Sequence, residues 1–211
     1  MATRTRPDIA FTVCYLERFN PDPNDRHWHC AKQVLRYLSG MKKLWLILGG
    51  EMRAAVRLAE FVDSDFARNA GTLKSTSGYV FPLGMGKIQW HSKRQALTAT
   101  STADAKLIVS VSAIKELVWF PNLMQEFIRS ELPVSTLYYN NHASLSTFKD
   151  TAYKPHSKHI GVRVHQIREF IEDGREVTMD YCRTNDMVAD GLTKPLVLSK
   201  HILFVRMCGL S

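Results

Sequence analysis

Residues 98–109 read TATSTADAKLIV, and the elements predicted on either side of this stretch decide the fold. Small hydroxyl residues come first, and Ser101 is a natural helix cap because its hydroxyl accepts from a free backbone N–H of the first helical turn. Apolar residues then recur at helical spacing, at Leu107, Val111, Ile114 and Val118. The pattern predicts a long helix from about residue 102 to 128.

Three strands are predicted before this helix, joined by short polar turns as in an antiparallel meander: residues 56–63, 77–84 and 87–92. After it, strands and helices alternate: a strand at 136–140, a short helix, a helix at 158–174 and a strand at 176–183. A meander followed by alternating strands and helices predicts an α/β fold with a five-stranded mixed sheet flanked by helices.

A small helical segment is predicted to precede this sheet domain. Pro7 can open one helix, a second continues to Gly40, and LWLIL at 44–48 is typical of a strand. A closing helical segment begins near Asp190 and is interrupted by Pro195, because proline lacks the N–H that a helix interior needs.

Composition indicates the class of protein and of partner. The 211 residues are 45% hydrophobic, which suits a globular protein with a real core, and the formal net charge of +8 favours a polyanionic partner such as nucleic acid. Four widely spaced cysteines suit a reducing compartment without disulfides. The N-terminus resembles neither a signal peptide nor a membrane span, so we expect an intracellular protein, cytoplasmic or nuclear, with no membrane partner.

Nine stretches resemble, in this order, the C-terminal part of the Pol polyprotein of copia-type LTR retrotransposons: RTRPDIAF, HWHCAKQVLRYLSG, FVDSDFARN, KSTSGYVFPLG, IQWHSKRQ, TSTADAKLIV, YYNNHASL, KHIGVRVHQIREFIEDG and VADGLTKPL. The resemblance implies that residues 1–50 are a remnant of the reverse transcriptase end and its connection. It implies a ribonuclease H-like domain at 51–196 and a helical tail at 197–211. The polymerase's own active-site strand lies upstream in the family, so polymerisation is not expected.

The same resemblance implies a site of four acids that hold Mg²⁺ in the family's ribonuclease H. Two of them fall on Asp63 in FVDSDF and Asp190 in VADGLTKPL, which are retained and are the predicted catalytic and metal-binding residues. The family's helix glutamate falls on Lys106 of STADAKL, and its strand aspartate falls on Asn140 of NNHASL. Lys106 and Asn140 are therefore predicted to be degenerate positions.

Lys106 is the more damaging of the two replacements. It places an ammonium where a dication should lie, and like charges about 4 Å apart repel by several kcal/mol in a partly buried site. Asn140 keeps a neutral oxygen, which tolerates a metal at reduced affinity. Asp104 lies about 200° around the helix from Lys106 and so faces the other way. If the four positions converge, we expect the ammonium of Lys106 to bridge Asp63 and Asp190 in place of metal.

Two other features bear on this hypothesis. Lys93 and Arg94, just after Trp90, are candidate contacts for a phosphate backbone, although a solvated turn is the simpler interpretation. Pro82 interrupts a predicted strand, where it removes a hydrogen-bond donor and fits only an edge or a bulge.

Three functions follow from these observations. The first is a retrotransposon-derived, ribonuclease H-like protein that is catalytically inactive. The second is an active Mg²⁺-dependent ribonuclease H that cleaves the RNA strand of RNA–DNA hybrids. The third is a non-catalytic module that binds an RNA–DNA hybrid or double-stranded nucleic acid through its backbone.

Overall fold

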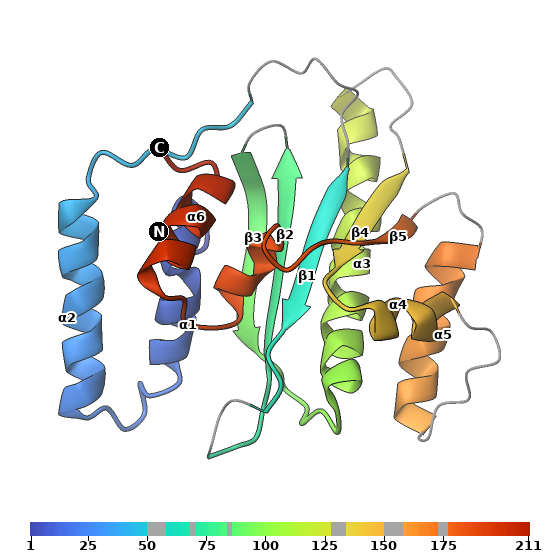
Figure 1. The fold of residues 1–211 in the computed structure, drawn as a ribbon, viewed down its shortest axis with the longest axis horizontal. Helices are drawn as coiled ribbons and strands as arrows, with labels where there is room; N and C mark the ends of the chain where they lie inside the picture. Colours follow the sequence, from blue (N-terminus) through green and yellow to red (C-terminus); the bar gives the residue numbers. More distant parts are fainter. Residues whose placement is uncertain (50–57, 68–70, 84–85, 128–133, 150–157, 173–176) are drawn as a thin grey trace.

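The computed structural model describes residues 1–49, 58–67, 71–83, 86–127, 134–149, 158–172 and 177–211 (Figure 1). Its helices are η1 (Pro7–Ile9), α1 (Ala10–Glu17), α2 (Asp25–Gly40), α3 (Thr102–Phe127), α4 (His142–Lys149), α5 (Lys158–Glu172), η2 (Val188–Leu192) and α6 (Leu198–Met207), where η denotes a 3₁₀ helix. Its strands are β1 (Ala59–Ser64), β2 (Thr76–Leu83), β3 (Gly86–Arg94), β4 (Ser135–Tyr139) and β5 (Val177–Tyr181).

The strands form one five-stranded sheet in the order β3-β2-β1-β4-β5. The pairs β1/β2 and β2/β3 are antiparallel, whereas β1/β4 and β4/β5 are parallel. The predicted mixed sheet flanked by helices is therefore confirmed. Several predicted element ends, at residues 56–57, 84, 128 and 173–176, lie outside the described residues.

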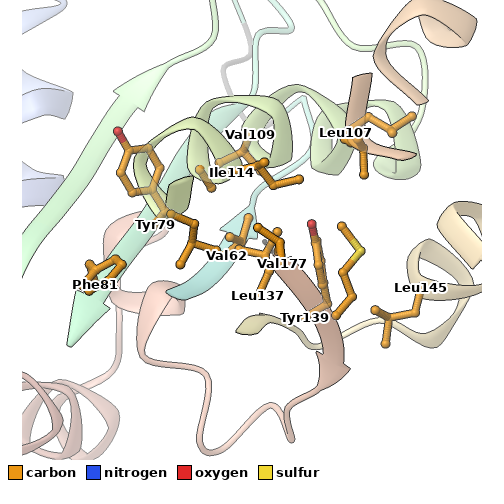
Figure 2. Close-up of a cluster of buried hydrophobic side chains, with 14 of the residues drawn as sticks. Val62, Tyr79, Phe81, Leu107, Val109, Ile114, Leu137, Tyr139, Leu145 and Val177 are labelled. Atoms are coloured by element: carbon orange, nitrogen blue, oxygen red, sulfur yellow. The ribbon is translucent and has the colours of Figure 1, made fainter. Parts of the chain in front are cut away.

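The main core lies between the sheet and α3 (Figure 2). Leu107, Ile114 and Leu117 of α3 are buried at helical spacing against Val62 of β1 and Leu137 of β4. By length and composition alone, α3 is long and apolar enough to cross a membrane. Packing against the sheet explains that apolar character equally well, because the central helix of a soluble protein has the same composition.

The opposite side of the sheet is covered from both ends of the sequence. α1 contacts β3, and η2 contacts β1 and β2 (Figure 1). Trp90 of β3 donates its indole N–H to the carbonyl oxygen of Ala2 at 2.6 Å, and Phe204 of α6 is buried in the same second cluster. The first residues of the chain thus dock on the sheet domain.

A close approach between β2 and η2 depends on Gly78. A Cβ atom at this position would lie 2.7 Å from Cγ2 of Thr193 and 2.9 Å from Cβ of Leu192. Gly78 pairs with Asp63 across the β1/β2 ladder, so the absence of a side chain brings the η2 segment against the end of β1.

The predicted strand at residues 44–48 is wrong. These residues make one isolated bridge, between Leu46 and Leu210, and Trp45 exchanges backbone hydrogen bonds with Ser211. The segment pairs with the last residues of the chain instead of joining the sheet. Pro82 lies next to a register shift between β2 and β3, as the bulge interpretation requires.

Glu60 of β1 is an uncompensated carboxyl inside the main core. It is fully buried, and neither carboxyl oxygen has a hydrogen-bond partner among the described residues. Burial raises the pKa of Glu60 well above its ordinary value, and the nearby charge of Glu116 raises it further. The folded protein therefore holds Glu60 in its protonated form at pH values where the unfolded chain has lost that proton.

This carboxyl predicts a pH-dependent loss of stability. The folded pKa is raised, so the stabilisation is complete below the ordinary glutamate pKa and is lost as pH rises toward the folded pKa, by about 1.4 kcal/mol per pH unit. Urea unfolding across this range should show the wild type losing stability relative to Glu60→Gln. Glu126→Gln, at an exposed position of α3, is the control and should follow the wild type. Parallel curves for the wild type and Glu60→Gln would contradict the prediction.

Candidate functional site

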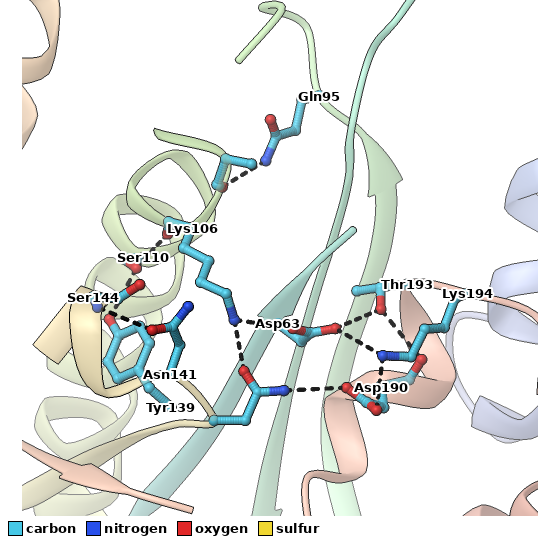
Figure 3. Close-up of polar contacts among 12 residues, drawn as sticks. Asp63, Gln95, Lys106, Ser110, Tyr139, Asn141, Ser144, Asp190, Thr193 and Lys194 are labelled. Carbon is cyan, nitrogen blue, oxygen red and sulfur yellow. Dashed lines mark hydrogen bonds and ion pairs between the residues drawn. The ribbon is translucent and has the colours of Figure 1, made fainter. Parts of the chain in front are cut away.

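Four side chains, joined to one another by hydrogen bonds and ion pairs, converge at one end of the central strands; Figure 3 labels three of them, Asp63, Lys106 and Asp190. Asp63 lies near the end of β1, and Asn140 directly follows β4, the parallel neighbour of β1. Lys106 projects from the first turns of α3, and Asp190 lies in η2. The structure thus brings together all four positions that the family resemblance assigned to the metal site.

Lys106 lies at the centre of this cluster and is buried. Its Nζ atom lies 3.3 Å from Oδ1 of Asp63 and donates to Oδ1 of Asn140 at 2.6 Å. An ammonium removed from water needs such partners, because an unpaired buried charge is costly. The two acceptors come from β1 and from the residue directly after β4.

A second lysine completes the arrangement. Nζ of Lys194 lies 2.8 Å from Oδ2 of Asp190 and 3.9 Å from Oδ2 of Asp63. The amide nitrogen of Asn140 lies 3.5 Å from Oδ1 of Asp190. The expectation that Lys106 bridges both aspartates is therefore wrong: Lys106 pairs with Asp63, and Lys194 lies between the two carboxylates. Lys194 lies four residues after Asp190, just beyond the end of η2.

The site shifts the pKa values of its two aspartates in opposite directions. Burial alone would raise the pKa of Asp63, but the charge of Lys106, the hydroxyl of Thr193 and the charge of Lys194 together hold it below its ordinary value. The Thr193 hydroxyl donates to Oδ2 of Asp63 at 2.7 Å. Burial and the negative charge of Asp63 raise the pKa of Asp190 to about 6, although Lys194 opposes this shift.

Asp104 does not join the cluster. One of its oxygens accepts from the backbone N–H of Thr100 at 3.0 Å, and the other pairs with Arg163 of α5 at 3.1 Å. The backbone N–H of Asp104 donates to the hydroxyl of Ser101, which caps α3 as predicted. Asp104 thus fixes the start of α3 and its contact with α5, and it faces away from Lys106 as expected.

Lys93 and Arg94 lie at the end of β3, opposite Ser77 and Thr76 of β2. Gly78 of the same strand is opposite Asp63, so both basic residues lie at the site's end of the sheet, two strands away. Lys93 is exposed and Arg94 is partly buried. Their contact with a phosphate backbone stays a prediction.

The family resemblance implies a Mg²⁺ ion at this site, but the oxygen atoms present do not suit one. Mg²⁺ requires oxygen ligands in near-octahedral geometry. Here both oxygens of Asp63 and the amide oxygen of Asn140 already accept from Lys106 or Thr193, and one oxygen of Asp190 is paired with Lys194. Among the described residues, no group of three or more histidine, cysteine, aspartate or glutamate side chains is placed to hold a metal.

Sequence reasoning missed two members of the site, Thr193 and Lys194. Both lie in the stretch VADGLTKPL, three and four residues after Asp190. In a predicted helical segment, residues three or four apart lie on one side of the helix. The spacing therefore could have indicated that Thr193 and Lys194 lie near Asp190.

The buried ion pair predicts a specific stability pattern. Lys106→Met should lower the free energy of unfolding by about 3 kcal/mol, because Asp63 loses its main compensating charge while staying buried. The double variant Lys106→Met with Asp63→Asn should recover most of that loss, because no charge is then left unpaired. Lys115→Met, at an exposed position of α3, serves as the control. Urea unfolding measures all three, and equal stability of Lys106→Met and the wild type would contradict the pairing.

Comparison with known proteins identifies the family. The retrovirus-related Pol polyprotein from transposon TNT 1-94 of Nicotiana tabacum is 34% identical over 206 residues, covering 98% of this chain and 15% of that protein. The one from transposon RE1 of Arabidopsis thaliana is 31% identical over 208 residues, covering 98% and 14%. The secreted RxLR effector protein 161 of Plasmopara viticola is 36% identical over 115 residues, which is 54% of this chain and 80% of that protein. No protein-family model matches the chain.

Solved structures give a more distant likeness. The N-terminal RNase H domain of Rv2228c from Mycobacterium tuberculosis has a TM-score of 0.49 at 9% identity, covering 72% of this chain and 98% of that chain. At this level the likeness carries no argument, so the fold rests on the strand order and directions described above. The chain thus spans only 14–15% of its Pol relatives, yet nearly all of it is matched. It belongs to the Pol polyproteins of copia-type LTR retrotransposons and has an α/β fold with a five-stranded mixed sheet flanked by helices.

Proposed function

We propose that this chain is a ribonuclease H-like domain whose catalytic centre is inactive. One observation carries the proposal: the ammonium of Lys106 lies 3.3 Å from Asp63 and 2.6 Å from Asn140, inside the cluster of four aligned positions. A tethered cation therefore takes the place in which the family's reaction requires a metal ion.

The charge balance of the site supports inactivity. Two-metal hydrolysis needs acids that hold two cations about 3.5–4 Å apart. The cluster has two carboxylates, Asp63 and Asp190, and two ammonium groups, Lys106 and Lys194, so its formal charge is already zero. A divalent ion entering this site gains little attraction and meets repulsion from both lysines.

The active-enzyme alternative requires Lys106 to leave the cluster. Its side chain is buried, and its departure would remove the main compensating charge of Asp63. Asp104 is held by Thr100 and Arg163 on another face of the helix, so it offers no substitute carboxylate. The geometry thus favours the inactive domain.

Restoring the acids should restore metal binding. The double variant Lys106→Glu with Asn140→Asp should gain Mn²⁺ binding, measured by calorimetry, and Mg²⁺-dependent cleavage of the RNA strand of a labelled RNA–DNA hybrid. The wild type should show neither. The physical reason is that two new carboxylates replace the resident cation and a neutral amide.

Lys115→Glu with Asn140→Asp is the matched control, because it makes the same change in net charge while leaving Lys106 in place. It should stay inactive. Robust metal-dependent cleavage by the wild type would contradict the proposal. So would a double variant that unfolds cooperatively and yet binds no Mn²⁺.

A second candidate, non-catalytic binding of an RNA–DNA hybrid or double-stranded nucleic acid, is favoured by Lys93 and Arg94. Both lie at the same end of the sheet as the cluster, and neither is ion-paired among the described residues. The net charge of +8 is consistent with a polyanionic partner. An inactive centre would leave this binding edge intact.

Phosphate contacts at that edge should appear in the salt dependence of binding. Lys93→Gln with Arg94→Gln should weaken hybrid binding and reduce the slope of log affinity against log salt by about 2, since each phosphate contact contributes about 1. Fluorescence anisotropy at several salt concentrations measures both. An unchanged slope would show that these residues do not contact phosphate.

A further inference from the structure

An open pocket of about 530 Å³ lies on the sheet, apart from the cluster around Lys106. Its walls come from all five strands and from the segment after β5. None of Asp63, Lys106, Asn140 and Asp190 lines it, so it is a second feature of the molecule. Its volume lies within the range of small-molecule binding pockets.

Aromatic rings form one part of this pocket. Phe61 of β1 and Tyr138 of β4 are register partners on neighbouring parallel strands, and their rings stack with centroids 5.1 Å apart and planes 19° from parallel. Both side chains are only partly buried. Tyr181, at the end of β5, adds a third ring to the lining and is 37% exposed. Planar ligands such as nucleobases stack on rings of this kind.

Lys87 of β3 supplies a cation to the same pocket. Its side chain is partly buried, and burial lowers the pKa of its ammonium. Among the described residues it has no ion pair and no side-chain hydrogen bond, in contrast to Lys106 and Lys194, which are both paired with carboxylates. A partly desolvated ammonium without an anion is well suited to receive one from a ligand.

Two further residues define the ligand's chemistry. Arg183, just after β5, is exposed and adds a second cation to the lining. Asp186 is the acid of the described lining, and its carboxylate can accept hydrogen bonds from N–H donors. A ligand that suits all these groups has a planar ring with N–H donors and carries an anionic group. A nucleotide has both.

We propose that this pocket binds a nucleotide, with the base against Phe61 and Tyr138 and the phosphate on Lys87 and Arg183. This binding is independent of the proposed inactivity of the cluster and of the edge that carries Lys93 and Arg94. The nucleotide can come from solution or from a single-stranded nucleic acid, and the experiment below separates these sources.

The test uses the full chain and isothermal titration calorimetry with adenosine monophosphate, cytidine monophosphate and a single-stranded DNA of about eight nucleotides. Saturable binding of at least one of these ligands is expected, with Lys87→Met weakening it by about tenfold or more. Tyr138→Leu should weaken it as well. Lys115→Met removes a charge from the outer side of α3 and should bind like the wild type. Thermal melting of each variant checks that the fold is kept, and Lys87→Met alone decides the question if Tyr138→Leu does not fold.

The two sources give different patterns. If the nucleotide comes from solution, monophosphate and oligonucleotide bind with similar affinity, whereas a single strand as the source makes the oligonucleotide clearly tighter. Either pattern supports the proposal if Lys87→Met abolishes or weakens the binding. No saturable binding at millimolar ligand would overturn the proposal. Wild-type affinity in Lys87→Met would also overturn it, as would oligonucleotide binding that is lost only in Lys93→Gln with Arg94→Gln.

Discussion

A buried ion pair between Lys106 and Asp63 joins the long helix to the central strand, and the arrangement of the cluster depends on it. An isolated carboxylate in that position would be strongly unfavourable, and an isolated ammonium would be equally so. The pair also orients Asn140, whose oxygen accepts from the lysine and whose nitrogen is turned toward Asp190. In contrast to a metal ion, this cation is covalently attached and cannot exchange with solvent.

Much of the fold follows from local patterns in the sequence. Strand-like stretches joined by short polar turns predicted β1, β2 and β3, and helical spacing with a cap at Ser101 predicted α3. The convergence of Asp63, Lys106, Asn140 and Asp190 was also anticipated, since the family resemblance supplied the alignment. Their roles in chemistry remain predictions.

Other features could not be predicted because they depend on contacts between distant residues. The segment at 44–48 has the composition of a strand, yet its partner is the end of the chain. The spacing after Asp190 indicates that Lys194 lies near that residue, but its position near Asp63 as well depends on the contact between η2 and β1, which are far apart in the sequence. Glu60 is a polar residue at a core position, so a pattern of apolar residues does not reveal its burial.

The pairing of residues 45–47 with residues 209–211 joins the last residues of the chain to a segment more than 150 positions earlier. Both ends belong to the layer that covers the sheet opposite α3, where Trp90 contacts Ala2 and Phe204 is buried. Loss of the last few residues would therefore remove support from a segment more than 150 positions earlier. The first and last residues of the chain cover the same apolar cluster, which includes Ala10, Trp90 and Phe204. Removing residues from either terminus should therefore expose this cluster and promote aggregation.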